Sequence, residues 1–366
     1  MRVIICVLLA IVCAWPAAAG DSAAFPPGTS QFFRTFANDA VVDLDGDVWV
    51  ALPEGIVRYT AAGRETVLAV PGGAAHRLAL AADGSIWFSN EAFVGRVSTA
   101  GTILEEYSIN GVNDLAVASD GALWYVRSYV DMVGRIADGT PAEFSTTQPW
   151  SLAPAEDGAM WVLRTGFGTT ADVLDRMADT GAITTIPLGT DVLFGDLQRA
   201  ADGTLFIGTG IRRGLLRRRP NQSRFTPVAA FSGSAFLVDD GGNIWSTEVN
   251  TLHYLSADGT LRFSVELPQD PRLEECSVNV PVWVYRALAL DSAGGLWLRI
   301  YNDAVGFPAP PCELPEPPEM PTLIRIDAAE LVAAHAAHET VPALSPGLLA
   351  ALAGLLIGIA ALRMRA

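Results

Sequence analysis

Residues 78–107 read LALAADGSIWFSNEAFVGRVSTAGTILEEY, a stretch in which short apolar segments alternate with glycine-containing turns. Asp83-Gly84 separates the first two apolar segments, which is the pattern of a tight hairpin between two strands. A third apolar segment surrounds Arg96, and a fourth begins after the turn glycine Gly101. The stretch therefore predicts a unit of four short strands.

The same unit recurs seven times along the chain. In every copy a glycine stands three residues before an aromatic residue, and most copies read Asp-Gly-x-x-aromatic. The pairs are Gly46/Trp49, Gly84/Trp87, Gly121/Trp124, Gly158/Trp161, Gly203/Phe206, Gly242/Trp245 and Gly294/Trp297, with spacings of 38, 37, 37, 45, 39 and 52 residues between aromatics. Four strands in a unit of this length are typical of a propeller blade. We expect an all-β, seven-bladed β-propeller.

The third strand of each unit carries a recurring basic residue. These residues are Arg58, Arg96, Arg135, Arg176, Arg217 and Arg325, with His253 in the sixth unit. A structural role is expected for His253, because it occupies an arginine position of the repeat. His335 and His338 follow the last unit.

The start of the chain is expected to complete the last blade. After Arg325 the sequence continues into an Ala-rich stretch with no fourth strand, whereas residues 29–36 match the fourth strand of the other units. A strand from the N-terminal side would join the two ends of the ring and remove an exposed edge. The propeller is predicted within residues 20–328.

The two ends of the chain have the composition of export and membrane segments. Residues 1–19 contain Arg2, an apolar run and an Ala-x-Ala site, as in a secretory signal peptide. Residues 329–340 are expected to form a helical spacer. Residues 341–366 form an apolar segment with arginines at its end, long enough to span a membrane. These features predict an exported, envelope-located protein.

Charge and cysteine content restrict the partners. The net charge of −16 argues against a nucleic-acid partner. Outside the signal segment only Cys276 and Cys312 remain, and in an oxidising compartment two cysteines favour one disulfide over a metal site.

The repeat resembles a known family. Asp-Gly-x-x-Trp-Phe/Val, followed by x-Gly-Arg-Ile/Val and Gly-Thr-Ile-x-x-Tyr, is similar to the streptogramin (virginiamycin B) lyase-like propellers. Residues 202–209 also resemble the sensor propellers of two-component regulators. The tail from Val341 to Ser345 resembles bacterial sorting tails of the IPTL kind, which implies recognition by an envelope protease related to exosortases.

The lyase resemblance implies a catalytic histidine at the start of an inner strand, a glutamate fourteen residues later and a bound magnesium ion. His76 holds the histidine position, but Asn90 stands where the acid is expected. Glu248 holds the acid position, but Ser234 stands where the histidine is expected. Each candidate catalytic residue, His76 and Glu248, lacks its partner.

The strand starts and the positions three after each aromatic are expected at one end of the ring. The candidate ligand-binding residues there are Asn38, Asn90, Asn113, Arg127, Trp150 and Arg164. Such side chains suit a polar or saccharide-like ligand, with Trp150 stacking on it. A solvated rim without a ligand is the alternative.

Two further motifs are expected to be structural. Asp43 to Asp47 resembles a calcium loop but coincides with a hairpin turn of the repeat. Arg217 to Arg219 is a basic run that fits a solvated strand edge better than a phosphate site.

The hypothesis favoured by the sequence is an envelope-tethered module that binds a protein or a glycan, without catalysis, metal or cofactor. The alternative is a lyase-like or lactone-hydrolysing enzyme with a diverged magnesium site. A sensor propeller is the third interpretation.

Overall fold

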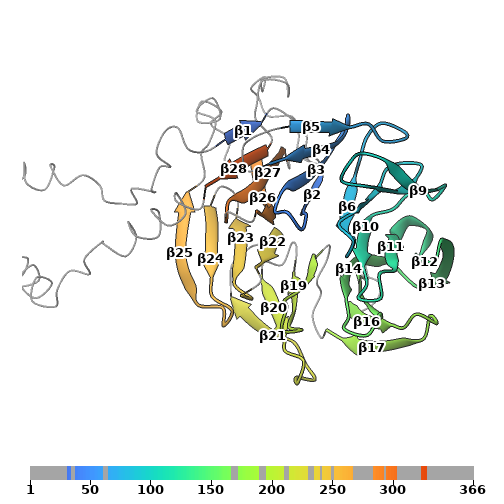
Figure 1. Cartoon of the computed structure of the whole chain (residues 1–366). Coiled ribbons are helices and arrows are strands. Elements are labelled where there is room, and N and C mark those ends of the chain that lie inside the picture. The colour runs from blue at the N-terminus through green and yellow to red at the C-terminus, as the bar shows by residue number, and fades with distance from the viewer. Residues whose placement is uncertain are drawn as a thin grey trace, which may run out of the picture.

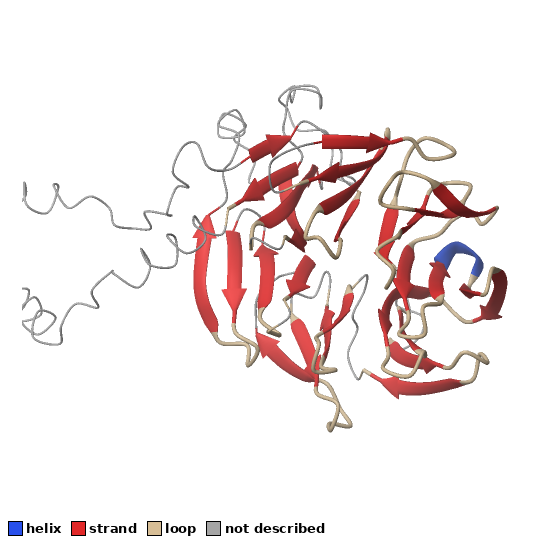
Figure 2. Ribbon diagram, viewed as in Figure 1, coloured by secondary structure: helices blue, strands red, loops and turns tan. Residues whose placement is uncertain are grey.

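The computed structural model describes residues 31–33, 38–60, 65–165, 172–188, 195–209, 214–229, 235–239, 241–248, 251–266, 283–291, 294–302 and 323–327. These residues form seven four-stranded antiparallel sheets, which are numbered here as blades 1 to 7. The blades surround a central axis (Figure 1), and a short 3-10 helix, η1 (Ser128–Val130), interrupts the strands (Figure 2). The prediction of a seven-bladed propeller is confirmed.

The strands follow one another from the axis outward in each of the first six blades. Blade 1 contains β2 (Asp39–Val42), β3 (Val48–Leu52), β4 (Gly55–Tyr59) and β5 (Glu65–Leu68). Blade 2 contains β6 (Arg77–Leu80), β7 (Ile86–Ser89), β8 (Val94–Val97) and β9 (Ile103–Tyr107). Blade 3 contains β10 (Asp114–Val117), β11 (Leu123–Arg127), β12 (Met132–Ala137) and β13 (Thr140–Ser145).

The second half of the ring repeats this plan. Blade 4 contains β14 (Pro149–Pro154), β15 (Met160–Arg164), β16 (Val173–Met177) and β17 (Ile183–Pro187). Blade 5 contains β18 (Leu197–Arg199), β19 (Leu205–Gly208), β20 (Leu215–Arg218) and β21 (Thr226–Ala229). Blade 6 contains β22 (Ala235–Val238), β23 (Ile244–Glu248), β24 (Thr251–Leu255) and β25 (Leu261–Glu266). Blade 7 contains β26 (Trp283–Leu290), β27 (Leu296–Asn302), β28 (Leu323–Ile326) and β1 (Gln31–Phe33).

The ring closes as expected, with a strand from the N-terminal side. β1 pairs antiparallel with β28, so that Phe32 lies opposite Ile324 (Figure 1). The first strand of each blade contacts the first strand of the next, and β26 of blade 7 contacts β2 of blade 1. The outer edge of β28 is therefore covered.

The glycine of each first hairpin is required by its backbone conformation. Gly84 has a φ of +82° and its N–H donates to the Ala81 carbonyl. Residues with a side chain rarely adopt this φ. The equivalent glycines of the other blades have φ between +77° (Gly242) and +85° (Gly46), which explains why glycine recurs at this place.

A second glycine, in the Gly-Arg motif of the third strand, makes room for an aromatic ring. Gly95 lies opposite Phe88, and Gly134 lies opposite Tyr125. A Cβ atom on Gly95 would lie 2.5 Å from Phe88 Cζ. The ring therefore occupies the space above the glycine, an arrangement that stabilises glycine in strands.

The core lies between adjacent blades. Trp124 of blade 3 is fully buried and packs with Leu152 and Met160 of blade 4. Trp297 of blade 7 packs with Ala40 and Val50 of blade 1, so the apolar packing also continues across the closure. Each blade buries its faces only against its neighbours, which makes the ring one cooperative unit.

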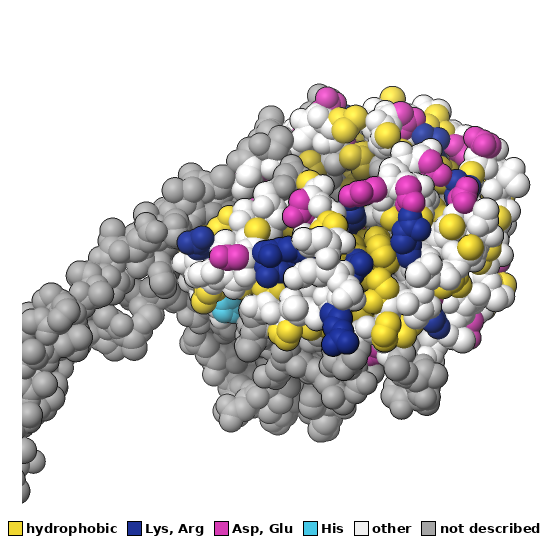
Figure 3. Space-filling model, turned by 90° about the horizontal axis from the view of Figure 1, so that it is seen from below, with side chains coloured by type: hydrophobic (Ala, Val, Ile, Leu, Met, Phe, Trp, Pro, Cys, Tyr) yellow, Lys and Arg dark blue, Asp and Glu magenta, His cyan; other side chains and the backbone are white. Residues whose placement is uncertain are grey.

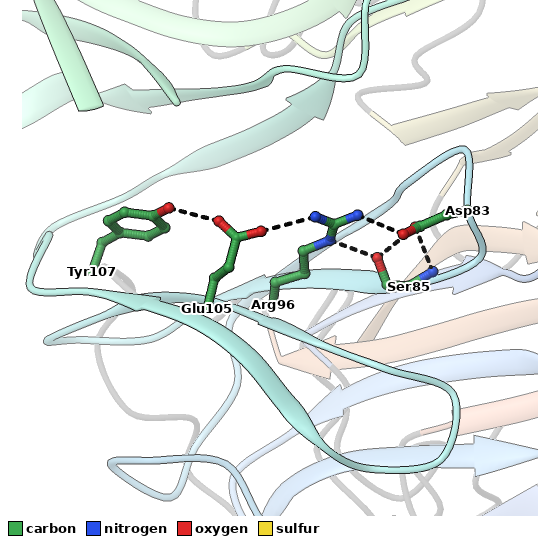
Figure 4. Close-up of polar contacts among 5 residues, drawn as sticks. All are labelled: Asp83, Ser85, Arg96, Glu105 and Tyr107. Carbon is green, nitrogen blue, oxygen red and sulfur yellow. Dashed lines mark hydrogen bonds and ion pairs between the residues drawn. The ribbon is translucent and has the colours of Figure 1, made fainter. Parts of the chain in front are cut away.

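The arginine of the third strand joins the two hairpins of a blade. In blade 2 the Arg96 guanidinium lies 5.3 Å from the Trp87 ring centroid, 2.7 Å from Asp83 and 2.8 Å from Glu105 (Figure 4). Tyr107 donates to Glu105 at 2.6 Å, and burial together with this bond raises the pKa of Tyr107 to about 12. The arginine thus stacks on the recurring aromatic residue of the repeat and pairs with an acid of the first turn, Asp83, and an acid of the fourth strand, Glu105.

Several expectations lie outside the described residues. These are the signal segment 1–19, the spacer 329–340, the tail 341–366 and the pair Cys276 and Cys312. His335, His338 and Ser234 also lie outside them. Among the described residues, no helix has the length and apolar character needed to cross a membrane.

Candidate functional site

The loops that carry most of the candidate residues meet at one end of the ring. The Asn90 amide, after β7, donates to the Pro71 carbonyl in the loop that enters blade 2. Ser128, after β11, donates to the Pro149 carbonyl at the start of blade 4. The loops after the second and fourth strands therefore share an end, and the Asp-Gly turns lie at the opposite end.

The two candidate catalytic residues, His76 and Glu248, lie in blades that are not adjacent. His76 lies just before β6 and Asn90 just after β7, and the His76 backbone N–H donates to the Ser89 carbonyl of β7. Asn90 is 3% exposed, and its side-chain oxygen Oδ1 accepts the backbone N–H groups of Ala92 and Phe93. Asn90 thus organises its own loop. Glu248 ends β23 in blade 6, which is not adjacent to blade 2.

Polar side chains near the start of five inner strands cap the backbone of the next blade. The bonds are Leu78 N to Asp39 Oδ2 (3.0 Å), Arg77 Nε to Asn113 O (2.6 Å), Leu152 N to Asp114 Oδ2 (2.8 Å), Leu197 N to Ser151 Oγ (3.3 Å) and Val238 N to Gln198 Oε1 (2.9 Å). The inner strand of a propeller blade is an edge strand with unpaired backbone groups. These side chains satisfy some of those groups and join blades 1 to 6 around the axis.

Two carboxylates and one guanidinium belong to this inner ring in blades 1 to 3. Burial raises the pKa of Asp114 to about 6, against the opposing effect of Arg77 and of the Leu152 N–H; the charge of Asp39 adds to the rise. The carboxyl therefore holds a proton more strongly than a solvated aspartate does.

The candidate ligand-binding arginines are already engaged within their blades. Arg127 donates to the Asn110 carbonyl and pairs with Glu143 at 2.8 Å. Arg164 pairs with the buried Asp175 at 2.6 Å. Their guanidiniums hold loops and outer strands together.

The candidate asparagines are engaged too. The Asn38 side-chain amide donates to the Ala75 carbonyl, and the Asn113 side-chain oxygen Oδ1 accepts the Ser128 N–H. Both contacts fix loops at this end of the ring.

An exposed aromatic residue in the loop that bonds to the start of blade 4 was not predicted from the sequence. Tyr129, in η1, is 88% exposed, and Val130 beside it is 52% exposed. The loop is fixed at Ser128, which donates to the Pro149 carbonyl, and at Asp131, whose carboxylate accepts the Gln148 N–H. Trp150, next to Pro149, is partly exposed. We call Tyr129, Val130 and Trp150 the aromatic edge.

The acidic motif of blade 1 is satisfied internally. Asp43 accepts the Asp45 and Asp47 N–H groups and the Trp49 indole N–H, and Arg58 lies 2.6 Å from Asp47. These contacts account for the motif as a turn, as expected. Within the described ranges, no three His, Cys, Asp or Glu side chains are grouped so that they could hold a metal ion.

Seven four-stranded blades closed around an axis define a seven-bladed β-propeller, a fold that serves many functions. The chain is similar in structure to virginiamycin B lyase from Staphylococcus aureus, with a TM-score of 0.61 and 17% identity over 81% of this chain and 97% of the lyase. It is also similar to the extracellular domain of a protein described as a hybrid two-component system of B. thetaiotaomicron, with a TM-score of 0.58 and 14% identity over 82% of this chain and 42% of the other.

The likeness extends to a propeller of another kind. The WD40 repeats of RRP9 give a TM-score of 0.61 at 10% identity over 83% of this chain and 98% of the other. No family model matches the sequence, and no curated protein matches it either. At these identities the likeness establishes the fold.

Proposed function

We propose that this protein is an exported, envelope-tethered binding module that holds a glycan-like or protein ligand at the aromatic edge. The observation that carries the proposal is Tyr129, which is 88% exposed although two side-chain hydrogen bonds fix its loop. A tyrosine on a fixed loop has only two side-chain torsions to lose on binding and offers a flat face for stacking.

The polar groups around the aromatic edge support binding rather than catalysis. Arg127, Arg164 and Asn90 hold loops, and His76 has no acid at the neighbouring position. An acid–base reaction needs both groups within hydrogen-bond reach of one substrate. A lyase-like or lactone-hydrolysing activity with a diverged magnesium site is the alternative, favoured by the overall likeness to virginiamycin B lyase.

Saccharide binding can be tested with the purified full-length protein and a panel of envelope polysaccharides and oligosaccharides, followed by isothermal titration calorimetry. We expect Tyr129→Ala and Trp150→Ala each to weaken the ligand at least tenfold, or by about 1.4 kcal/mol. Leu44→Ala is the matched control, because Leu44 is 71% exposed on the turn at the opposite end of blade 1. Equal affinity of Tyr129→Ala and the unsubstituted protein would exclude the aromatic edge as the site.

The location is tested separately by deleting residues 341–366. We expect the deletion to move the protein from the membrane fraction into soluble export, because the apolar tail is the proposed anchor. An unchanged fractionation would remove the tethering part of the proposal and leave the binding site untouched.

A further inference from the structure

Positive charge is concentrated in one blade of an acidic protein. All 24 basic residues are arginines, and residues 195–229, which include blade 5, contain seven of them with only two aspartates. The whole chain carries −16. Figure 3 looks at the molecule from the side of blades 4 and 5, where basic side chains cross the middle of the view and most acidic ones lie above them. Such a local excess attracts anions.

Arg217 of blade 5 departs from the ion pair that the repeat uses elsewhere. In blades 2 and 3 the equivalent arginines pair with the turn aspartates, Arg96 with Asp83 and Arg135 with Asp120. Arg217 instead donates to the Ala257 carbonyl of blade 6 at 2.6 Å, and no ion pair of Arg217 is found among the described residues.

The turn aspartate of blade 5, Asp202, accepts hydrogen bonds within its own turn. Asp202 accepts the N–H and the hydroxyl of Thr204 at 2.8 and 3.0 Å. Asp83 of blade 2 makes the same two bonds to Ser85 and still pairs with Arg96, so these bonds do not by themselves prevent an ion pair. Arg217 donates to Ala257 instead, and the rest of its guanidinium keeps donors for another partner.

A cavity of about 260 Å³ lies where these groups meet, between the turns of blades 5 and 6. Its lining includes Arg217, Arg219, Thr204, Gly241 and Asp258. Gly241 stands at the position that an aspartate holds in most other blades (Asp83 in blade 2), so blade 6 places no carboxylate there. The absent side chain contributes to the space.

Two guanidiniums border this cavity. Successive residues of a strand point to opposite faces, so Arg217 and Arg219 share one face and Arg218 points to the other. The Arg218 guanidinium lies 5.5 Å from the Trp161 ring centroid of blade 4. The Arg219 side chain is exposed and has no ion pair within the described ranges. Burial, and then the neighbouring charge of Arg219, lower the pKa of Arg217, and the charge of Asp258 opposes them in part. An anion between them would relieve this repulsion.

The second carboxylate of the lining is also satisfied locally. Asp258 accepts the Ser256 hydroxyl at 2.6 Å and the Thr260 N–H at 3.0 Å. Both carboxylates of the lining thus accept hydrogen bonds from their own turns, and the two guanidiniums supply donors for a ligand in the cavity.

We propose that this cavity is a binding site for a tetrahedral oxyanion, phosphate or sulfate, either free or carried by a small organic molecule. Guanidinium groups bind such anions through paired, charge-assisted hydrogen bonds. The site lies at the end of the ring opposite the aromatic edge. Failure of either proposal in its test therefore leaves the other unaffected.

The test is calorimetric titration of the full-length protein with inorganic phosphate, sulfate and a hexose phosphate, each against chloride at equal ionic strength. We expect one site per chain, weakened at least tenfold in Arg219→Gln. Gly241→Asp restores the aspartate of the repeat and should abolish binding. Its Cβ would lie 3.0 Å from the Asn243 amide nitrogen and 3.3 Å from Asp239 Oδ1, so these two side chains must shift by a few tenths of an ångström.

Arg224→Gln is the matched control, because it removes the same charge from an exposed position of the same blade that does not line the cavity. We expect its affinity to stay within twofold of the unsubstituted protein. Absence of phosphate and sulfate binding, or equal losses in Arg219→Gln and Arg224→Gln, would overturn the proposal. Binding to phosphatidylglycerol vesicles without binding of the free anions would overturn it as well.

Discussion

At the scale of single residues, the inner ring of polar side chains gives the protein a specific pH dependence. The pKa of Asp114 is about 6 in the folded chain, above its ordinary value of 3.8, because burial outweighs the attraction of Arg77. The folded state therefore binds this proton more tightly than the unfolded chain. The resulting stabilisation is complete below about pH 4 and is lost as the pH rises through 6.

Asp114→Asn should remove that component. We expect the free energy of unfolding of the variant, relative to the unsubstituted protein, to rise by roughly 2–3 kcal/mol between pH 4 and pH 7. Urea unfolding at pH 4, 5, 6 and 7 measures the difference, and effects of all other groups cancel in the comparison. Parallel pH profiles for the two proteins would show that Asp114 ionises freely.

The glycine of the Gly-Arg motif makes a second residue-scale prediction. A Cβ on Gly134 would lie 1.9 Å from Tyr125 Cζ, and Tyr125 is fully buried. Gly134→Ala should therefore cost roughly 2–3 kcal/mol of stability. Gly121→Ala, where the φ is +84° and no atom lies within 4 Å of the Cβ, should cost only about 1 kcal/mol.

Combining Gly134→Ala with Tyr125→Val should restore part of the loss in thermal unfolding experiments. Blade 1 tolerates the corresponding pair, Val50 opposite Val57, without a glycine. Additive losses in the double variant would contradict the steric explanation.

At the scale of the strand, the closure of blade 7 depends on β1. Its three residues pair with β28, and removal of residues 20–37 would leave that strand with unpaired backbone groups. We expect the truncated protein to melt at a lower temperature and to aggregate in size-exclusion chromatography. A chain truncated to start at Gly28 keeps β1 and serves as the control. Identical melting of both truncations would refute the role of β1.

The strands were predictable where the repeat forces one residue type. Glycine at the first turn is required by a positive φ, and the aromatic that follows fills the space between blades; both leave the same signature in every blade. The inner ring of polar side chains left no such signature, because different residue types occupy its places. Asp39 and Ser151 accept backbone N–H groups of the next blade, whereas Arg77 donates to a backbone carbonyl. Tyr129 was missed because the residues between the second and third strands differ from blade to blade, although an aromatic residue in a polar loop was a usable signal.

At the scale of the whole molecule, the position of a residue around the ring decides what it can do. The sequence alone placed His76 and Glu248 in different blades, and the structure assigns them to blades 2 and 6. The structure also shows that the Asn90 side-chain amide is engaged in its own surroundings, because it donates to the Pro71 carbonyl and accepts the Ala92 N–H. The likeness in fold therefore does not by itself predict lyase chemistry for this chain.

For this reason we expect no turnover of a streptogramin B antibiotic by this protein. Opening the lactone by proton abstraction needs a placed base, and a metal that stabilises the developing charge. Each missing acid or base typically lowers the rate by about two to four orders of magnitude. The test is incubation of the full-length protein with the antibiotic and magnesium, with the linear product followed by chromatography and with virginiamycin B lyase as the positive control. Ring opening that is lost in His76→Ala and retained in Arg224→Gln would contradict this expectation. The end of the ring that carries His76 would then be a working catalytic site.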